Sequence, residues 1–150
     1  MQAAYGGNPS RLYLAQRINS ASAEELAAML LEGAQRHLLE AVKAIQRKDH
    51  LAKARHMQRV SEIMQKLMGM LNPEADSQLV NRLHGIYIWW VKEMFEGSRK
   101  NRPEQIERVV RQMTQMRNGW TELSSRGKGP AMDPAGHGQA RAFGAEGLVG

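Results

Sequence analysis

The sequence predicts an all-α protein, an antiparallel four-helix bundle in up-down-up-down order with an N-terminal arm and a disordered Gly-rich C-terminal tail. Three observations predict this fold. Apolar residues recur every three or four positions through most of residues 22–124. The two prolines of that stretch, Pro73 and Pro103, fall between the periodic segments. The connections at these breaks are short, so neighbouring helices should run antiparallel.

The arm covers residues 1–21 and carries no leader signature, because no basic segment is followed by an apolar one. Nor does any stretch of the chain approach the roughly 18 apolar residues that a membrane-spanning helix requires. We therefore expect a cytosolic protein that does not insert into membranes.

The first helix of the bundle should begin at Ser22 and end near Lys48. Ser22 and Glu25 have the spacing of a capping box, in which each side chain accepts a hydrogen bond from the other residue's amide. The main apolar stripe that follows is formed by Leu26, Leu30, Ala34, His37, Ala41 and Ile45. A second row beside it is formed by Leu31, Leu38 and Val42.

The second helix should follow the turn at residues 48–50 and stop near Asn72 and Pro73. Its apolar positions alternate at spacings of three and four, which is typical of a bundle seam. They are Met57, Val60, Met64, Leu67 and Leu71, with Ile63 and Met70 in a second row.

The third helix should begin at Asp76 or Ser77 and extend to about Arg99. Its main stripe is formed by Leu79, Leu83, Ile86, Trp90 and Met94. A second row, formed by Ile88, Val91 and Phe95, lies about 100° round the helix, and Trp89 points to yet another side. One core cannot cover all of these side chains.

The fourth helix should begin at Pro103, because proline is favoured at the first helical position and Glu104 complements the positive end of the helix dipole. Its stripe is formed by Ile106, Val109, Met113, Met116, Trp120 and Leu123. The tail, residues 125–150, contains half of the chain's 14 glycines and little apolar periodicity, so we expect it to be disordered.

The residues that carry chemistry give no enzyme signature. The 150-residue chain lacks cysteine, and none of its five histidines has a glutamate three residues before it, as a di-iron bundle requires. No Gly-x-Ser-x-Gly nucleophile motif is present. We interpret His37 as a hydrogen-bonded packing residue, and we predict a protein without catalytic activity, metal or cofactor.

The formal net charge of +6 raises the alternative of a nucleic-acid-binding bundle. Residues 1–124 hold 18 Lys and Arg against 13 Asp and Glu, a balance of +5, so the excess lies in the arm and bundle. No helix-turn-helix or RNA-binding motif accompanies this charge. A solvated basic face that steers an acidic partner is the favoured interpretation, without nucleic acid as a partner.

The second apolar rows allow two further interpretations. They either widen the core or form a homodimer face, or they form a groove for the apolar side of partner helices. Eight of the ten methionines lie in the four helices and suit either interpretation, since methionine packs adaptably.

An ordered set of motifs resembles the family of flagellar secretion chaperones called FliS. The motifs are Tyr13 and Ile18, Ser-Ala-Ser-Ala-Glu-Glu-Leu at 20–26, Met-Leu-Leu-Glu-Gly-Ala at 29–34, Ile-Tyr-Ile-Trp at 86–89 and Met-Arg-Asn-Gly-Trp at 116–120. Each motif alone is weak, but their order and spacing over residues 13–123 make the resemblance specific.

The resemblance implies a cytosolic chaperone that binds the C-terminal helices of flagellin, prevents premature polymerisation and delivers flagellin to the flagellar export gate. It also implies that Tyr13 and Ile18 belong to an arm that covers part of the binding surface, and that Tyr87 and Trp89 match a Tyr-x-Tyr motif; core packing is an equal alternative for Tyr87. The predicted partner-binding residues are Tyr13, Ile18, Leu31, Leu38, Ile63, Met70, Tyr87, Ile88, Trp89, Val91 and Phe95.

Overall fold

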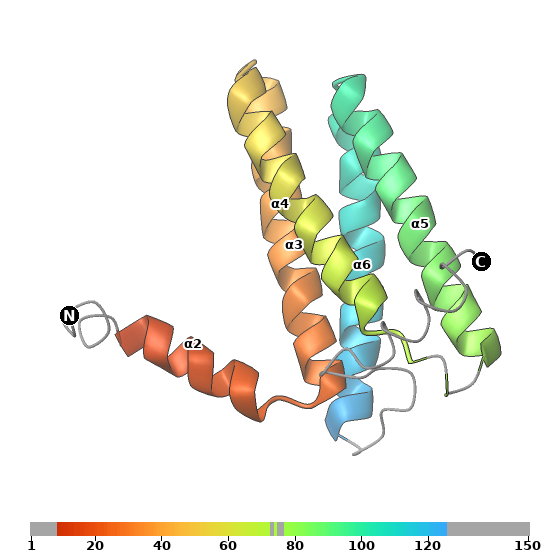
Figure 1. Ribbon diagram of the computed structural model, residues 1–150. Helices are drawn as coiled ribbons and strands as arrows, with labels where there is room; N and C mark the ends of the chain where they lie inside the picture. Colours follow the sequence, from red (N-terminus) through yellow and green to blue (C-terminus); the bar gives the residue numbers. More distant parts are fainter. Residues whose placement is uncertain (1–8, 73, 75–76, 126–150) are drawn as a thin grey trace.

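The computed structural model describes residues 9–72, 74 and 77–125. Within these ranges the chain forms five α-helices and no β-strand, which confirms the predicted all-α class (Figure 1). The helices are α2 (Pro9–Ser20), α3 (Ala23–Gln46), α4 (His50–Gly69), α5 (Ser77–Arg99) and α6 (Pro103–Ser125). Except for Ser125, the predicted tail lies outside the described residues, as do residues 1–8 of the arm.

The four longer helices, α3 to α6, lie side by side and alternate in direction along the chain (Figure 1). Helix α3 packs most extensively, against α4 on one side and α6 on the other. Helix α5 packs mainly on α6 and less on α4. Helix α2 makes little contact with the others and extends away from them beyond the connection at Ala21 and Ser22 (Figure 1).

Local chemistry sets the helix ends. The amide of Glu25 donates to Ser22 Oγ at 3.1 Å and the amide of Ser22 donates to Glu25 Oε1 at 2.9 Å, so the predicted capping box is confirmed. Asp49 caps α4 by accepting from the amide of Ala52 at 3.0 Å, and this hydrogen bond is the main reason why the pKa of Asp49 is lowered. Pro103 is the first residue of α6.

The core is built from all four long helices. Its largest fully enclosed side chains are Trp90, Tyr87, Leu31, Leu38, Met64, Leu67, Met94, Ile106, Met113, Val60 and Val109. Tyr87 and Trp90 pack against each other with ring centroids 5.8 Å apart. The predicted α4 seam of Met57, Val60, Met64, Leu67 and Leu71 is buried, which confirms that prediction.

The buried side of α3 includes residues of both the main stripe and the second row. Leu31, Leu38 and Val42 of the second row are buried, as are Ala34 and Ala41 of the main stripe, which supports the interpretation that this row widens the core. Leu26, Leu30 and Ile45, expected on the main stripe, are only partly buried. The buried side of α3 also includes a polar residue: Gln35 lies against α6, where its Nε2 donates to the Val110 carbonyl at 2.8 Å and to Thr114 Oγ1 at 2.7 Å.

Met70 and Tyr87, both among the predicted partner-binding residues, are also buried. Met70 ends α4 as its C-cap and turns into the core. Tyr87 takes the core position of α5 that was expected for Ile86, and Ile86 is exposed instead. The core-packing alternative for Tyr87 is therefore the one that the structure supports.

Candidate partner-binding site

Helix α5 exposes apolar side chains on two opposite sides. On one side Ile88 and Phe95 are exposed and Val91 is partly buried; we call these three residues the Ile88 row. On the other side Ile86 and Trp89 are exposed. These exposed side chains confirm that one core does not cover the apolar residues of this helix.

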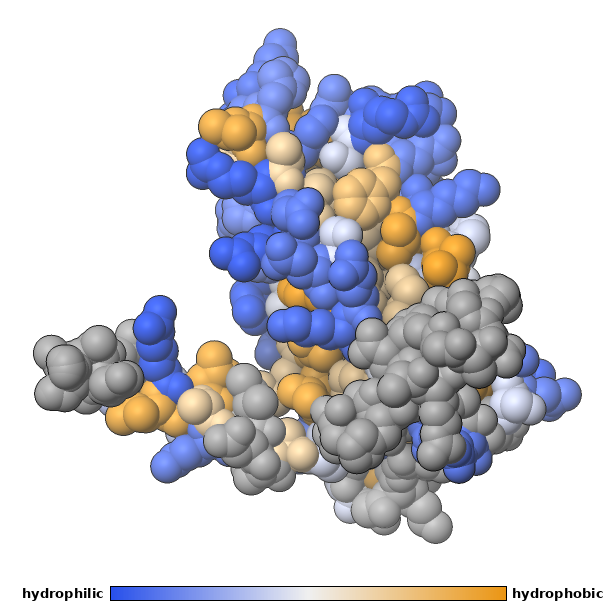
Figure 2. Space-filling view, in the orientation of Figure 1, coloured by the Kyte–Doolittle hydropathy of each residue, from blue (hydrophilic) through white to orange (hydrophobic). Residues whose placement is uncertain are grey.

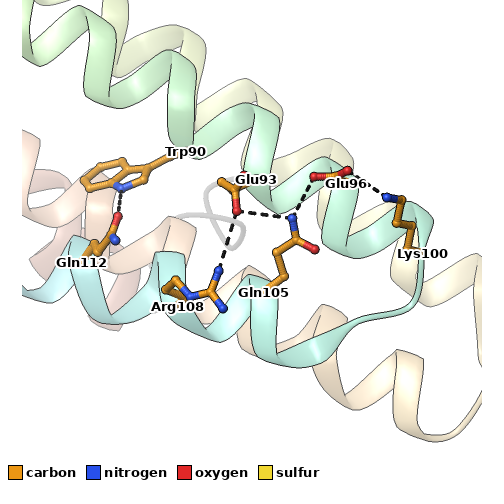
Figure 3. A network of polar contacts seen from close by, with 7 residues as sticks. All are labelled: Trp90, Glu93, Glu96, Lys100, Gln105, Arg108 and Gln112. Carbon is orange, nitrogen blue, oxygen red and sulfur yellow. Dashed lines mark hydrogen bonds and ion pairs between the residues drawn. The ribbon is translucent and has the colours of Figure 1, made fainter.

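A polar network joins α5 to α6 (Figure 3). Trp90 Nε1 donates to Gln112 Oε1 at 2.7 Å, and Gln105 Nε2 donates to Glu96 Oε1 at 2.9 Å and to Glu93 Oε1 at 3.3 Å. Trp90, Glu93 and Glu96 therefore face α6, which places the Ile88 row on the opposite side of α5, toward α4.

Two cations balance the acidic members of this network (Figure 3). Lys100 Nζ lies 2.9 Å from Glu96 Oε2, and Arg108 Nη1 lies 3.9 Å from Glu93 Oε1. The hydrogen bond from Lys100 is the largest cause of the lowered pKa of Glu96, followed by that from Gln105. Neither carboxylate of this network therefore adds an unbalanced negative charge to the α5–α6 surface.

The Ile88 row remains open because α4 and α5 contact each other least among the neighbouring helix pairs. Figure 2 shows a band of hydrophobic atoms over this part of the molecule, between polar surfaces. Val91 at the centre of the row packs against the core, so the row is continuous with the interior. Such a surface suits the apolar side of an amphipathic helix.

The other side of α5 borders an open groove between α5 and α6, with a volume of about 750 Å³; we call it the Trp89 groove. Ile86, Trp89 and Met116 supply its apolar surface, and Gly85, Arg82, Gln112 and Gln115 complete its walls together with Trp90. This groove was not predicted from the sequence, because Ile86 and Met116 fit the periodic core stripes of their helices.

The predicted arm residues lie in α2, a helix that the apolar periodicity does not predict. Leu12, Tyr13 and Leu14 are consecutive and all exposed, with Tyr13 at 65%. Ile18 belongs to the same helix, but its side chain lies outside what the structure describes. The described contacts do not place Tyr13 against the Ile88 row.

The predicted site residues thus fall into three groups. Tyr13, Ile88, Trp89 and Phe95 are exposed, and Ile63 and Val91 are partly buried. Leu31, Leu38, Met70 and Tyr87 are buried, so a partner cannot touch them unless the core opens. Burial raises the pKa of Tyr87, and the neighbouring Trp120 only partly opposes this shift.

His37 forms a hydrogen-bonded pair with His56 of α4, with the two Nδ1 atoms 3.0 Å apart, as its interpretation as a packing residue predicted. Burial, followed by the charges of His56 and Arg36, lowers the pKa of His37. In the described part of the chain, no group of three or more acidic or histidine side chains is arranged to hold a metal ion.

The fold and these surfaces define a class of protein: an all-α chain with apolar side chains exposed on both sides of one helix. None of the helices within the described ranges has the length and apolar character needed to cross a membrane. The model of the family described as flagellar protein FliS matches residues 6–127, so the chain belongs to that family. The flagellar secretion chaperone FliS of Vibrio cholerae serotype O1 is 21% identical over 107 residues, which cover 71% of this chain and 79% of the relative.

Proposed function

We propose that this protein is a cytosolic flagellar secretion chaperone that binds the C-terminal helical region of flagellin. By covering the apolar faces of those helices it prevents premature polymerisation, and it aids delivery of flagellin to the flagellar export gate. Membership of the FliS family and the name of the Vibrio relative support this role. The family is not one of enzymes, and the proposed activity needs neither metal nor cofactor.

The observation that carries the proposal is the Ile88 row. Ile88 is 48% exposed in the middle of a helix, and Phe95 lies two turns further along the same side. Burying such side chains against a partner contributes roughly 25 cal/mol for each Å² of apolar surface removed from water. Flagellin helices with exposed apolar faces are suitable ligands for this surface.

The finer architecture belongs to the same proposal. Helices α3 to α6 form an antiparallel up-down-up-down four-helix bundle, while the predicted tail beyond Ser125 lies outside the described residues. Helix α2 is an arm whose exposed residues Leu12, Tyr13 and Leu14 cover the Ile88 row when flagellin is absent. The short connection at Ala21 and Ser22, together with the small contact area of α2, supports an arm that changes position.

Burial revises the set of proposed contact residues. Ile88, Val91 and Phe95 contact flagellin directly. Ile63 of α4 is partly buried beside Gly33 of α3, and Trp89 lies on the other side of α5, so neither belongs to the Ile88 row. Leu31, Leu38, Met70 and Tyr87 instead support the surface from within the core. A homodimer that formed through the Ile88 row would compete with flagellin for the same side chains.

Calorimetric titration tests the proposal. The protein should bind full-length flagellin and fail to bind flagellin that lacks its C-terminal helices. Ile88→Ser and Phe95→Ser should each weaken binding by about tenfold or more, since central apolar contacts dominate interfaces. Leu51→Ser is the matched control, because Leu51 is also an exposed apolar helix residue but lies at the start of α4, outside the row. Equal binding to both forms of flagellin would refute the proposal.

A further inference from the structure

We propose that the Trp89 groove is a second docking site, which binds an amphipathic helix of a protein partner. That helix has acidic residues along one edge and a small residue where it crosses α5 near Gly85. The groove lies on the side of α5 opposite the Ile88 row. Its occupancy does not depend on flagellin binding to that row, so the two proposals stand or fall separately.

The apolar surface of the groove comes from both helices. Ile86 is 39% exposed and Trp89 is 42% exposed, and Met116 of α6 lies across from them. Large apolar side chains that stay this exposed in neighbouring positions of a folded chain are typical of an interaction surface. Trp is also among the residues that contribute most to binding energy at interfaces.

Gly85 gives the groove its shape. A Cβ atom at Gly85 would meet no other atom within 4 Å, so packing inside the chain does not require glycine there. Glycine within a helix costs about 1 kcal/mol relative to alanine. Beside Ile86 and Trp89, the missing side chain leaves a gap in the wall through which the backbone of a second helix can approach closely.

The charge of the groove favours a partner helix with acidic residues. Arg82 lines the groove and forms no salt bridge with any residue that the structure describes. The acidic residues further along α5, Glu93 and Glu96, already have Arg108 and Lys100 as ion-pair partners. The groove therefore offers an uncompensated cation, which complements an acidic edge on the partner.

The same cation disfavours the two occupants that this chain itself could supply. Helix α2 carries Arg11 and Arg17 and no acidic residue, so docking it would bring cations toward Arg82. A second copy that docked through the same groove by twofold symmetry would place the two Arg82 side chains on one shared surface. A separate acidic helix avoids both repulsions.

The probe for the test is a synthetic helical peptide of about 18 residues with leucine at helical spacing, alanine at the crossing point and glutamate along one edge. A second peptide carries lysine in place of every glutamate. Binding to the full chain is followed by calorimetry and by tryptophan fluorescence, since Trp89 is exposed whereas Trp90 and Trp120 are buried. The glutamate peptide should bind at least about tenfold more tightly than the lysine peptide at low salt, with a difference that shrinks as salt rises.

Two pairs of variants localise the site. Gly85→Gln fills the gap and should lower the affinity for the glutamate peptide about tenfold or more, whereas Gly119→Gln should leave it unchanged. Gly119 is the matched control, because its Cβ would also meet no atom within 4 Å but it does not line the groove. Arg82→Gln should remove most of the preference for glutamate over lysine, while Arg99→Gln, an exposed arginine outside the groove, should preserve it.

Several outcomes would overturn the proposal. These are equal affinity for the two peptides, equal losses in Gly85→Gln and Gly119→Gln, or light scattering that shows a dimer which Gly85→Gln dissociates. Easier acrylamide quenching of Trp89 after deletion of α2 would mean that the arm occupies the groove. Ile88→Ser should keep its affinity for the peptide, which separates failure of this groove from failure of the flagellin proposal.

Discussion

Gly97 of α5 lies so close to Ile106 of α6 that a Cβ atom at position 97 would stand 3.0 Å from Ile106 Cγ1. The same atom would stand 3.1 Å from Gln105 Cβ and 3.2 Å from the carbonyl oxygen of Arg102. The turn is closed there, since the amide of Arg102 donates to the Gly97 carbonyl at 2.8 Å. The α5–α6 turn therefore needs glycine at this point, where the two helices begin to pack.

Gly97→Ala should destabilise the protein by about 1 to 2 kcal/mol, because the strain of overpacking exceeds the gain in helix propensity. Urea unfolding followed by circular dichroism measures the change. Gly85→Ala is the control, since a Cβ there meets nothing within 4 Å, and it should stabilise the protein by about 0.5 to 1 kcal/mol. Two changes of the same sign would show that the close approach is not the deciding factor.

Gln112→Ala should destabilise the protein by about 1 to 3 kcal/mol, because it removes the acceptor of a 2.7 Å hydrogen bond from the indole of the buried Trp90. The same urea measurement applies. Gln115→Ala, an exposed residue one turn along α6, should change the stability by less than about 0.5 kcal/mol. If the two variants matched, the Trp90–Gln112 bond would contribute nothing to holding α5 on α6.

The positions of the helix ends could be predicted from the sequence because local chemistry determines them. Ser22 and Glu25 satisfy each other's amides within one turn, and Pro103 suits a first helical position whatever lies around it. Helix α2, in contrast, was not predicted from the sequence. Its apolar residues Leu12, Tyr13 and Leu14 are consecutive, so no helical period reveals it.

The rotation of a helix about its axis depends on its neighbours, so periodicity placed the α4 seam correctly but misplaced single positions of α3 and α5. Gln35 is polar, and its place in the core depends on acceptors in α6 and on Arg117, whose Nη1 donates to Gln35 Oε1 at 2.8 Å. In α5, Tyr87 points inward and Ile86 outward, and Trp90 is hydrogen-bonded to Gln112 of α6. The exposed Ile88 row was nevertheless predicted, because it lies about 100° round the helix from the main apolar stripe.

Lys48→Gly should stabilise the protein by about 1 kcal/mol. Lys48 has φ of 59° in the α3–α4 turn, a left-handed conformation that costs a residue with a side chain about 1 to 2 kcal/mol. Asn101 has a similar φ of 54° in the α5–α6 turn, but asparagine tolerates this region and its Oδ1 accepts from Lys53 Nζ at 2.9 Å. Thermal unfolding should therefore show a gain for Lys48→Gly and none for Asn101→Gly; a gain in both would show that the Lys53 contact is dispensable.

The His37–His56 pair should make the protein less stable as the pH falls. One ring must present a bare Nδ1 to the other across 3.0 Å, so both cannot be protonated while the pair persists. Burial, His56, Arg36 and Arg59 lower the pKa of His37 below its ordinary value of 6.5, against a smaller opposite effect of Glu40.

Because the folded-state pKa is the lower one, the unfolded chain binds more protons below about pH 6.5, and the stability present above that pH is lost as the pH falls toward the folded-state pKa. Urea unfolding at about pH 7.5 and pH 5.5 should show a smaller loss for His37→Gln than for the unmodified protein. His50→Gln, at the exposed start of α4, should leave the loss unchanged. An identical loss in all three proteins would assign the pH dependence to groups other than this pair.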